Sequence, residues 1–378
     1  MNNHIKTDIK ELCTGCGVCK AVCSVNAIKF NFDDEGFLSP EVDEKLCLNC
    51  GKCLKACHLQ SEGTSDKRKP LGQYAVKVKN ENVRIRSRSG GAFVALSNFI
   101  LKQGGIVYGA VLNSSLKTVH FRAETAEDRN KMCGSKYVQS NTLEIWEQLK
   151  EDVLSGRLVL FTGTPCQVEA ANQYIGKNYE NLYLCDFVCH GVPSPKLFES
   201  YLSFMQNKFG GKIIGFDFRD KREHTWASHV EKTVFEENRI IYSRRYTNIF
   251  YSNNCLRRSC YKCRYTSPDR ASDFTIADYW GIDKTAPEFD DGKGISALLI
   301  RGEKAKMVLN SVMNEIEIVD TSKYPLPHYN LKRPTAMPET HDKFFEDMKK
   351  HGFGFVSSKY GGYDFLRKLR YKIKDKIN

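Results

Sequence analysis

Eight cysteines near the start of the chain form the clearest chemical pattern in the sequence. They fall into two runs with the same spacing, C-x2-C-x2-C-x3-C. In such a pair of runs, three thiolates of one run hold one [4Fe–4S] cubane, and the fourth cysteine reaches the other cubane. The pattern therefore predicts one cluster on Cys13, Cys16, Cys19 and Cys57, and a second on Cys47, Cys50, Cys53 and Cys23.

The alternatives for these cysteines are zinc and structural thiols. Zinc prefers two separate C-x2-4-C pairs and does not require the four-cysteine run twice. The stretch instead resembles a bacterial two-cluster ferredoxin, and Gly15, Gly17 and Gly51 suit a backbone that passes close to a cluster. Ser24 and His58 stand where such ferredoxins usually have proline. This departure affects hydrogen bonding and reduction potential, but not ligation.

Length and composition limit the class of protein. The chain has 378 residues, 15 cysteines, 41% hydrophobic residues and a formal net charge of +12. This length suits two or three domains with ordinary buried cores. We expect no membrane-spanning helix, because no apolar run approaches the length that a bilayer requires. The polar segment Met1–Lys10 lacks the apolar core of a secretory signal. Free thiols at this level predict a cytoplasmic protein that uses them for metals or redox chemistry.

Charge is distributed unevenly along the chain. Residues 1–62 hold 7 basic and 9 acidic side chains, whereas the remainder holds 50 basic and 36 acidic ones. A polar stretch from Glu62 to Pro70 separates the two parts and predicts a linker. The predicted domains are a ferredoxin-type domain at 1–62, a linker at 63–71, a larger domain at 72–330 with parts near 72–155 and 156–330, and an extension at 331–378.

The larger domain shows alternating strand and helix patterns, which predict parallel βαβ units. The predicted fold class is a mixed α/β and α+β arrangement, in which a small two-cluster ferredoxin module precedes a larger α/β domain. Segments 213–218 and 230–235 predict strands that pair antiparallel. The other predicted strands are 105–111, 158–161 and 182–188, and the predicted helices are 92–102, 143–154, 167–175 and 196–209.

Six short motifs follow one another through the larger domain. Together and in this order they resemble the beta subunit of coenzyme F420 hydrogenase/dehydrogenase, over roughly residues 72–330, and an attached N-terminal ferredoxin is common in that family. The motifs are Ser89-Gly90-Gly91, Gly134-Ser135-Lys136-Tyr137, Gly163-Thr164-Pro165-Cys166-Gln167, Cys189-His190-Gly191-Val192-Pro193, Arg258-Ser259-Cys260-Tyr261-Lys262-Cys263, and the stretch from Ser272 to Gly281.

The resemblance implies an oxidoreductase that carries FAD and a third [4Fe–4S] cluster. Such a protein passes electrons between iron–sulfur centres and FAD, and on to a hydride carrier, such as an F420-like deazaflavin or a nicotinamide, or to an organic substrate. Carried over by motif, the third cluster uses Cys166, Cys189, Cys260 and Cys263. Cys166 and Cys189 each follow a predicted buried strand, where α/β folds place their sites.

A second ligand set remains open for the third cluster. Cys255-x4-Cys260-x2-Cys263 has the spacing of a plant-type ferredoxin and needs one distant cysteine. Zinc and plain structural thiols are further alternatives. Cys133 and Cys185 are expected to be ordinary buried thiols.

The flavin site is predicted on two of the motifs, namely Ser89, Gly90, Gly91 and Gly134, Ser135, Lys136, Tyr137. Backbone amides at the start of helix 92–102 suit an anion or a flavin ring, and Lys136 suits a phosphate or the flavin N1 position. A plain turn and a surface lysine are the alternatives. There is no G-x-G-x-x-G nucleotide motif.

Several further residues receive a preliminary interpretation. Arg219-Asp220-Lys221, with Trp226, is interpreted as a surface ion-pair loop. His190 and His224 are considered as proton donors, because histidine titrates near neutral pH. Catalytic residues are not assigned.

The expected partners follow from the predicted redox role. They are a redox protein or ferredoxin and a small electron carrier or substrate, with no nucleic acid, because the chain lacks a recognisable nucleic-acid-binding motif. The basic helix predicted at 364–378 either packs on the body or touches an anionic membrane. A non-catalytic electron-transfer subunit that docks on another redox enzyme is the alternative function.

Overall fold

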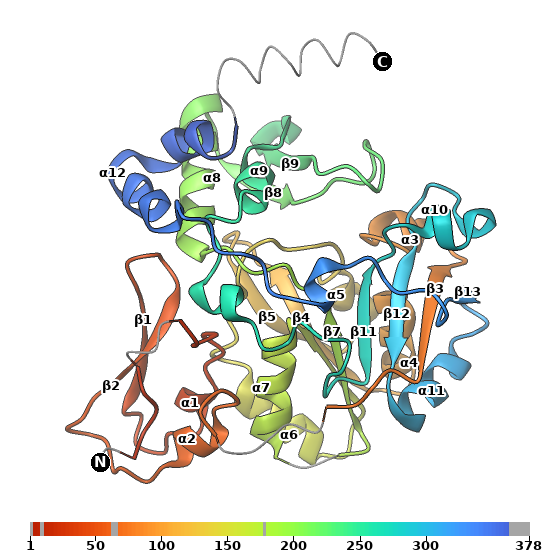
Figure 1. Cartoon of the computed structure of the whole chain (residues 1–378), viewed down its shortest axis with the longest axis horizontal. Helices are drawn as coiled ribbons and strands as arrows, with labels where there is room; N and C mark the ends of the chain where they lie inside the picture. The colour runs from red at the N-terminus through yellow and green to blue at the C-terminus, as the bar shows by residue number, and fades with distance from the viewer. Residues whose placement is uncertain (1–2, 8–10, 62–66, 177–178, 363–378) are drawn as a thin grey trace.

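A computed structural model describes residues 3–7, 11–61, 67–176 and 179–362. The described chain comprises a small N-terminal module, a central eight-stranded sheet, and a second lobe of helices with a three-stranded sheet (Figure 1). The linker residues 62–66 and the basic tail 363–378 lie outside the described residues. No described helix has both the length and the apolar character needed to cross a membrane.

The N-terminal module pairs a β-hairpin with two short helices. Strands β1 (Ile28–Phe32) and β2 (Leu38–Val42) are antiparallel. Helix α1 (Val18–Ala21) begins after Gly17, and helix α2 (Lys52–Ala56) begins after Gly51. Both glycines are left-handed, with φ of 84° and 73°, a conformation that other residues adopt only at a cost. The chain therefore requires glycine at the turn inside each cysteine run.

The central sheet has the strand order β13-β3-β12-β11-β7-β6-β4-β5. Strands β4, β6, β7 and β11 are mutually parallel, which confirms the predicted βαβ units, and the remaining pairings are antiparallel. The bounds are β3 (Gly72–Val78), β4 (Ile106–Leu112), β5 (Thr118–Ala123), β6 (Val159–Gly163), β7 (Leu182–Phe187), β11 (Phe274–Asp278), β12 (Ser296–Ile300) and β13 (Ile316–Asp320).

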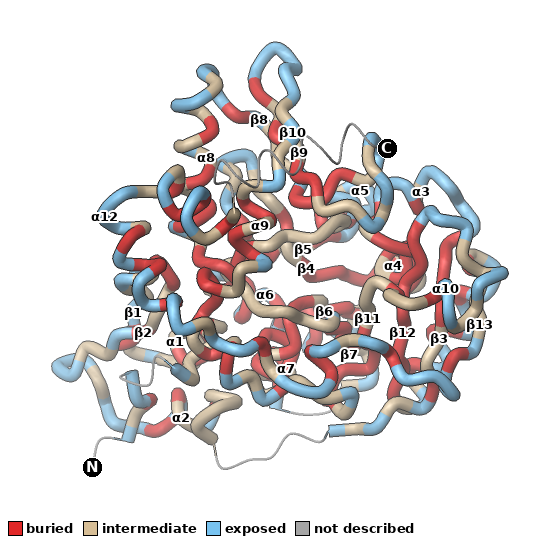
Figure 2. Tube along the Cα trace, turned by 45° about the horizontal axis from the view of Figure 1, so that its top comes forward, coloured by how far each residue is buried: buried red, intermediate tan, exposed pale blue. Residues whose placement is uncertain are grey.

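Helices cover both faces of this sheet, so its central strands are buried (Figure 2). Helices α4 (Ala92–Lys102) and α11 (Gly302–Ser311) pack on one face. Helices α6 (Trp146–Leu154) and α7 (Pro165–Ile175) pack on the other, together with α1 of the N-terminal module. The shorter helices are α3 (Glu81–Arg86), α5 (Ala126–Asn130) and α10 (Ile282–Thr285).

The second lobe has an aromatic core. Its sheet has the order β10-β9-β8, all antiparallel, as predicted for segments 213–218 and 230–235. Side chains such as Phe198, Tyr201 and Phe353 fill the space between this sheet and the helices. The elements are β8 (Ile213–Asp217), β9 (Glu231–Phe235), β10 (Ile240–Ser243), α8 (Pro195–Phe209), α9 (Arg245–Tyr251) and α12 (His341–Lys359).

Candidate iron–sulfur and cofactor site

The first predicted cluster set is gathered where the module meets the central sheet. Burial, and then the neighbouring Cys13 and Cys57, raise the pKa of the Cys16 thiol to about 12. Burial raises the pKa of Cys19 as well, with smaller contributions from Cys16, Cys13, Cys57 and Cys53. The four cysteines of this set therefore lie within electrostatic reach of one another. Such thiols bind a metal by giving up their protons.

The second predicted set is surrounded by backbone amides of the module itself. Backbone amides point at three of its sulfurs: Ala27 N donates to Cys23 Sγ at 3.3 Å, Asn49 N to Cys47 Sγ at 3.4 Å, and Ile5 N to Cys53 Sγ at 3.4 Å. Hydrogen bonds of this kind to cluster sulfurs help to set a cluster's reduction potential. Cys50 is exposed, so this site faces solvent.

A third group of cysteines lies at the carboxyl ends of the parallel strands. Cys166 opens α7 directly after β6, and Cys189 follows β7. Burial raises the pKa of Cys189, and the next contributions come from Cys260, Cys166 and Cys263. The structure thus brings together the four cysteines that the family motifs indicate.

Cys255 has a different environment. Its side chain is fully buried, and its thiol donates to the carbonyl oxygen of Ile249 at 3.5 Å. Of the other cysteines, Cys260 is the one that perturbs its pKa. This environment favours a structural thiol over a ligand. Cys185 is also buried, as expected, whereas Cys133 is only partly so.

The spacing of the sulfurs bears on the choice between zinc and a cubane. Four sulfurs on a tetrahedral zinc, each at about 2.3 Å, lie about 3.8 Å apart. Among the described residues, no three cysteine sulfurs lie within 4.8 Å of one another. No cysteine group that the structure describes is thus as compact as a four-sulfur zinc site.

A group of Glu35, His341 and Asp342 does meet that distance limit. The guanidinium of Arg258 lies between its two carboxylates, with Nε 2.6 Å from Glu35 and Nη2 2.5 Å from Asp342. The group is therefore an ion-pair network that joins the module to α12.

Side chains of the larger domain hold the first cysteine run by its backbone. Arg257 Nε donates to the carbonyl of Cys13 at 2.7 Å, and Thr142 Oγ1 and Trp146 Nε1 donate to that of Cys16 at 2.7 and 2.9 Å. A Cβ on Gly17 would lie 2.5 Å from Leu143 Cδ2. The glycine thus serves close packing between the two domains, in addition to the turn.

His58 joins the first cysteine group to the third. Its Nδ1 contacts the Tyr265 hydroxyl and its Nε2 lies 3.2 Å from Thr14 Oγ1. Burial, and then Arg264, lower the pKa of His58 to about 3. Cys166, Cys263 and Cys16 are among the groups that act on the pKa of Tyr265. This tyrosine therefore lies within reach of sulfurs from both groups.

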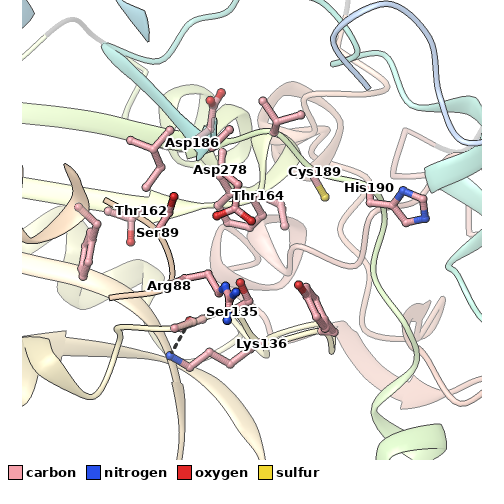
Figure 3. A pocket seen from close by; sticks show the side chains of 18 of the residues that line it. Arg88, Ser89, Ser135, Lys136, Thr162, Thr164, Asp186, Cys189, His190 and Asp278 are labelled. Atoms are coloured by element: carbon pink, nitrogen blue, oxygen red, sulfur yellow. Dashed lines mark hydrogen bonds between the residues drawn. The ribbon is translucent and has the colours of Figure 1, made fainter. Parts of the chain in front are cut away.

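A cavity of about 410 Å³ lies beside the third cysteine group, at the carboxyl ends of β4, β6, β7 and β11 (Figure 3). Open α/β sheets bind their ligands at this edge, and the volume is in the range of small-molecule sites. Cys189 lines this cavity, so the cysteine group and the cavity share a wall. The predicted flavin-site residues in the lining are Ser89, Gly91, Gly134, Ser135, Lys136 and Tyr137.

Gly90 is the one member of the predicted flavin site outside this lining. A Cβ at Gly90 would lie 2.1 Å from the Val76 carbonyl oxygen and 2.5 Å from Ser296 N. Gly90 therefore allows the loop to pass tightly against β3 and β12. Gly91, with φ of 91°, then begins α4.

Two partly buried lysines hold the loops of the cavity. Burial lowers the pKa of Lys136 to about 8, and that of Lys221 to about 7, the latter with help from Arg84 and Arg88. Each ammonium group donates to several backbone carbonyls and so fixes the shape of its loop. The acceptors are Lys131, Met132, Cys133 and Gly134 for Lys136, and Arg84, Ser87 and Ser89 for Lys221.

The interpretation of residues 219–221 as a surface ion-pair loop is wrong. Arg219 is 5% exposed and donates to Asp278 Oδ2 at 2.8 Å. Trp226 stacks on Trp280 with ring centroids 4.8 Å apart. Arg88 donates to the carbonyls of Arg219 and Trp226. The segment belongs to the cavity wall because the partners Asp278, of β11, and Arg88, of the loop before α4, compensate Arg219 for its lost contact with water.

Aromatic rings form another part of the lining. Tyr137 stacks on Phe250 with centroids 4.5 Å apart, and His190 meets Phe250 and Tyr251 edge-on or tilted. Burial lowers the pKa of His190, although Asn253 opposes this through a hydrogen bond of 2.7 Å. His224 packs on Tyr242 outside the lining. Of the two histidines considered as proton donors, His190 is therefore the one at the cavity.

Arg88, His120 and His328 are among the polar members of the lining that sequence reasoning missed. Arg88 directly precedes the Ser-Gly-Gly motif, and its position could have indicated it. The two histidines come from β5 and from the segment after β13, and no local pattern marks them.

Fold and site together define an iron–sulfur protein in which a dicluster module is fused to a mixed α/β domain. Residues 12–60 match the 4Fe-4S dicluster domain family, which supports two [4Fe–4S] clusters. Residues 156–323 match the family described as the C terminus of the coenzyme F420 hydrogenase/dehydrogenase beta subunit. The resemblance seen in the motifs is thereby confirmed for these two segments of the chain.

Individual relatives cover parts of the chain. An uncharacterized protein of Methanocaldococcus jannaschii is 26% identical over 200 residues, which are 45% of this chain and 54% of the relative. The B subunit of the Na(+)-translocating ferredoxin:NAD(+) oxidoreductase complex of Acetobacterium woodii is 47% identical over 45 residues, 12% of either chain. The chain thus spans about half the length of the first relative and about an eighth of the length of the second.

Among solved structures, a chain of the F420-reducing [NiFe] hydrogenase complex from Methanosarcina barkeri is similar, with a TM-score of 0.48 and 17% identity. The match covers 75% of this chain and 91% of the other.

Proposed function

We propose that this protein is an iron–sulfur flavoprotein oxidoreductase. Electrons pass singly through the dicluster module to a third [4Fe–4S] cluster, and from there to FAD in the cavity. FAD then exchanges them as a pair with a hydride carrier, such as a deazaflavin or a nicotinamide, or with an organic substrate. The observation that carries the proposal is the position of Cys189, which belongs to the third cysteine group and also lines the cavity.

The proposed ligands follow the three groups of cysteines. Cys13, Cys16, Cys19 and Cys57 hold the first cluster, Cys47, Cys50, Cys53 and Cys23 the second, and Cys166, Cys189, Cys260 and Cys263 the third. In this scheme residues 1–62 form the ferredoxin-type domain, 63–71 the linker, 72–330 the cofactor-binding domain and 331–378 an extension.

The order of electron transfer is supported by the contacts between groups. Cys166 is among the groups that raise the pKa of Cys16, so the first and third groups are neighbours. The second group includes Cys50, which is exposed to solvent. The sequence of sites from solvent to cavity is therefore second, first, third.

The cavity residues fit a flavin dinucleotide in charge and shape. The start of α4 and the buried cations suit a pyrophosphate, and Arg88 Nε is buried without a partner among the described residues. The Tyr137–Phe250 stack offers a flat apolar surface to a ring system. When bound, FAD supplies a centre that accepts electrons one or two at a time.

The protein's own groups exclude water and position protons. Arg219 and Asp278, which both line the cavity, form a buried ion pair, and Arg219 also donates to the Trp226 carbonyl. Burial lowers the pKa of His190, which is held by Asn253, and so favours its neutral form. A neutral imidazole can accept a proton at one ring nitrogen and become a cation.

Anaerobic purification with iron, sulfide and flavin analysis tests the proposal. We expect about twelve irons per chain and one FAD. The Cys189→Ser variant should retain about eight irons, and Cys255→Ser serves as the matched control with unchanged iron. A result of about eight irons and no flavin in the unmodified protein would refute the proposal and leave the alternative of an electron-transfer subunit without its own catalysis.

A further inference from the structure

The outer end of the dicluster module combines exposed apolar and basic side chains around the second cysteine group. We call Lys45, Leu46, Leu48, Cys50 and Lys52 the outer surface. Leu46 and Leu48 are 48% and 67% exposed, and Cys50 and both lysines are exposed as well. Large apolar side chains beside a redox site are characteristic of a surface that is covered by a partner.

The larger domain leaves this end of the module free. Among the described residues, every hydrogen bond and ion pair of residues 43–51 goes to another residue of the module. The first cysteine run, by contrast, is held by Arg257, Thr142 and Trp146 of the larger domain. An external protein can therefore approach the second group and not the first.

Charge is sorted between the two ends of the module. Residues 1–62 carry a net charge of −2, yet Glu11 and Glu35 are paired with Lys262 and Arg258 of the larger domain. On the outer surface, Lys45 and Lys52 form no ion pair with any residue that the structure describes. The exposed Glu44 beside Lys45 is paired with His4 at 2.9 Å, so the unpaired charges of the outer surface are its two lysines.

The geometry points to a docking site for a small, acidic, one-electron carrier protein on the outer surface. Lysines attract an acidic partner and speed its encounter, and Leu46 and Leu48 supply the apolar centre of a small, transient interface. One electron passes per encounter: the carrier loses it and the second cluster gains it, with no bond formed or broken. The inference rests on the proposed function only for the direction in which electrons flow. The docking site itself requires neither the third cluster nor the flavin.

The test mixes the holoprotein, in a stopped-flow instrument, with an acidic two-cluster ferredoxin that has been reduced and freed of reductant. Reduction of the chain's clusters is followed by absorbance and by low-temperature electron paramagnetic resonance. The variants are Lys45→Glu/Lys52→Glu and, as a control of equal charge change, Lys284→Glu/Lys323→Glu. Both control lysines are exposed: Lys284 lies in α10, and Lys323 follows β13 at the far edge of the sheet (Figure 1).

We expect the outer-surface variant to lower the second-order rate constant at low salt by about tenfold or more. The difference should disappear at high salt, where such charges are screened, and the control variant should behave as the unmodified protein. Leu48→Asn should weaken complex formation at every salt concentration. Equal slowing by the control, or no slowing by the outer-surface variant, would overturn the inference. Flavin and iron content, measured on the same samples, report separately on the proposed function.

Discussion

The contact between His58 and Tyr265 predicts how firmly the dicluster module is held on the larger domain. The Tyr265→Phe substitution removes only a hydroxyl group, but that hydroxyl is the partner of His58 Nδ1. Tyr265 is buried, and His58 keeps a contact to Thr14 alone. The substitution therefore leaves a polar nitrogen without a partner at a domain interface.

The expected cost follows from the burial of this nitrogen. An unsatisfied buried polar group costs about 1–3 kcal/mol, because neither water nor another side chain replaces the lost bond. The bond joins two domains, so the cost falls on their association. The population in which the module has separated should rise about 5- to 150-fold, the factor that corresponds to this free energy.

Hydrogen exchange of an N–H that bonds across the interface measures this population. The indole N–H of Trp146, which donates to the Cys16 carbonyl, should exchange faster in Tyr265→Phe by that factor. Tyr261→Phe is the control, because the Tyr261 hydroxyl donates to the Asn253 carbonyl within the larger domain. It should leave the exchange of the Trp146 indole N–H unchanged.

A double-mutant cycle completes the test. Combining Tyr265→Phe with His58→Leu should cost less than the sum of the two single changes, with a coupling of about 0.5–3 kcal/mol. Strict additivity, or unchanged exchange in Tyr265→Phe, would show that the pair does not hold the interface.

Three further predictions concern packing, pH and the cavity. Gly17→Ala should destabilise the module's contact with the larger domain by more than backbone strain alone, because its Cβ would meet Leu143. Gly156→Ala has φ of 82° and open space, so it should cost only the strain of about 1–2 kcal/mol. Thermal unfolding compares the stability of the two variants. Burial lowers the pKa of His120 from 6.5 to about 4, so below pH 6.5 the unfolded chain binds a proton that the folded chain does not. Stability should fall over this window by up to about 1.4 kcal/mol per pH unit, and His120→Gln should flatten the denaturation profile between about pH 6.5 and 5. Lys221→Met should weaken FAD binding about 5- to 150-fold in a fluorescence titration, since the loop carbonyls lose a buried donor worth about 1–3 kcal/mol.

Each of these has an outcome that would contradict it. Equal loss of stability in Gly17→Ala and Gly156→Ala would remove the packing argument. If His120→Gln leaves the pH dependence of stability unchanged, groups other than His120 dominate it in this pH range. Unchanged FAD affinity in Lys221→Met would show that the loop keeps its shape without the ammonium group.

Local patterns predicted the βαβ units well, and long-range pairing poorly. Strands β4, β6 and β7 each carry a short apolar run followed by a helix pattern, so their type and parallel direction follow from neighbouring residues. Nothing local places β3 between β12 and β13, where it pairs antiparallel with both. Such pairings depend on residues that are far apart in sequence.

The candidate site shows the same division. Cysteine spacing and the glycine motifs carry their meaning within a few residues, and the structure gathers the predicted third group as well. Arg219 was misjudged because a charged triplet normally lies in solvent. Its burial depends on Asp278, which is close in space and distant in the chain.

The position of β3 in the sheet has a consequence for biosynthesis. This strand leaves the ribosome early, but both of its neighbours, β12 and β13, emerge near the end of synthesis. Until then its backbone amides and carbonyls have no partner, and an unpaired strand of this kind promotes aggregation. The segment that matches the beta-subunit family, residues 156–323, lacks this strand. Expressed alone, this segment would lack the strand that lies between β12 and β13 in the sheet.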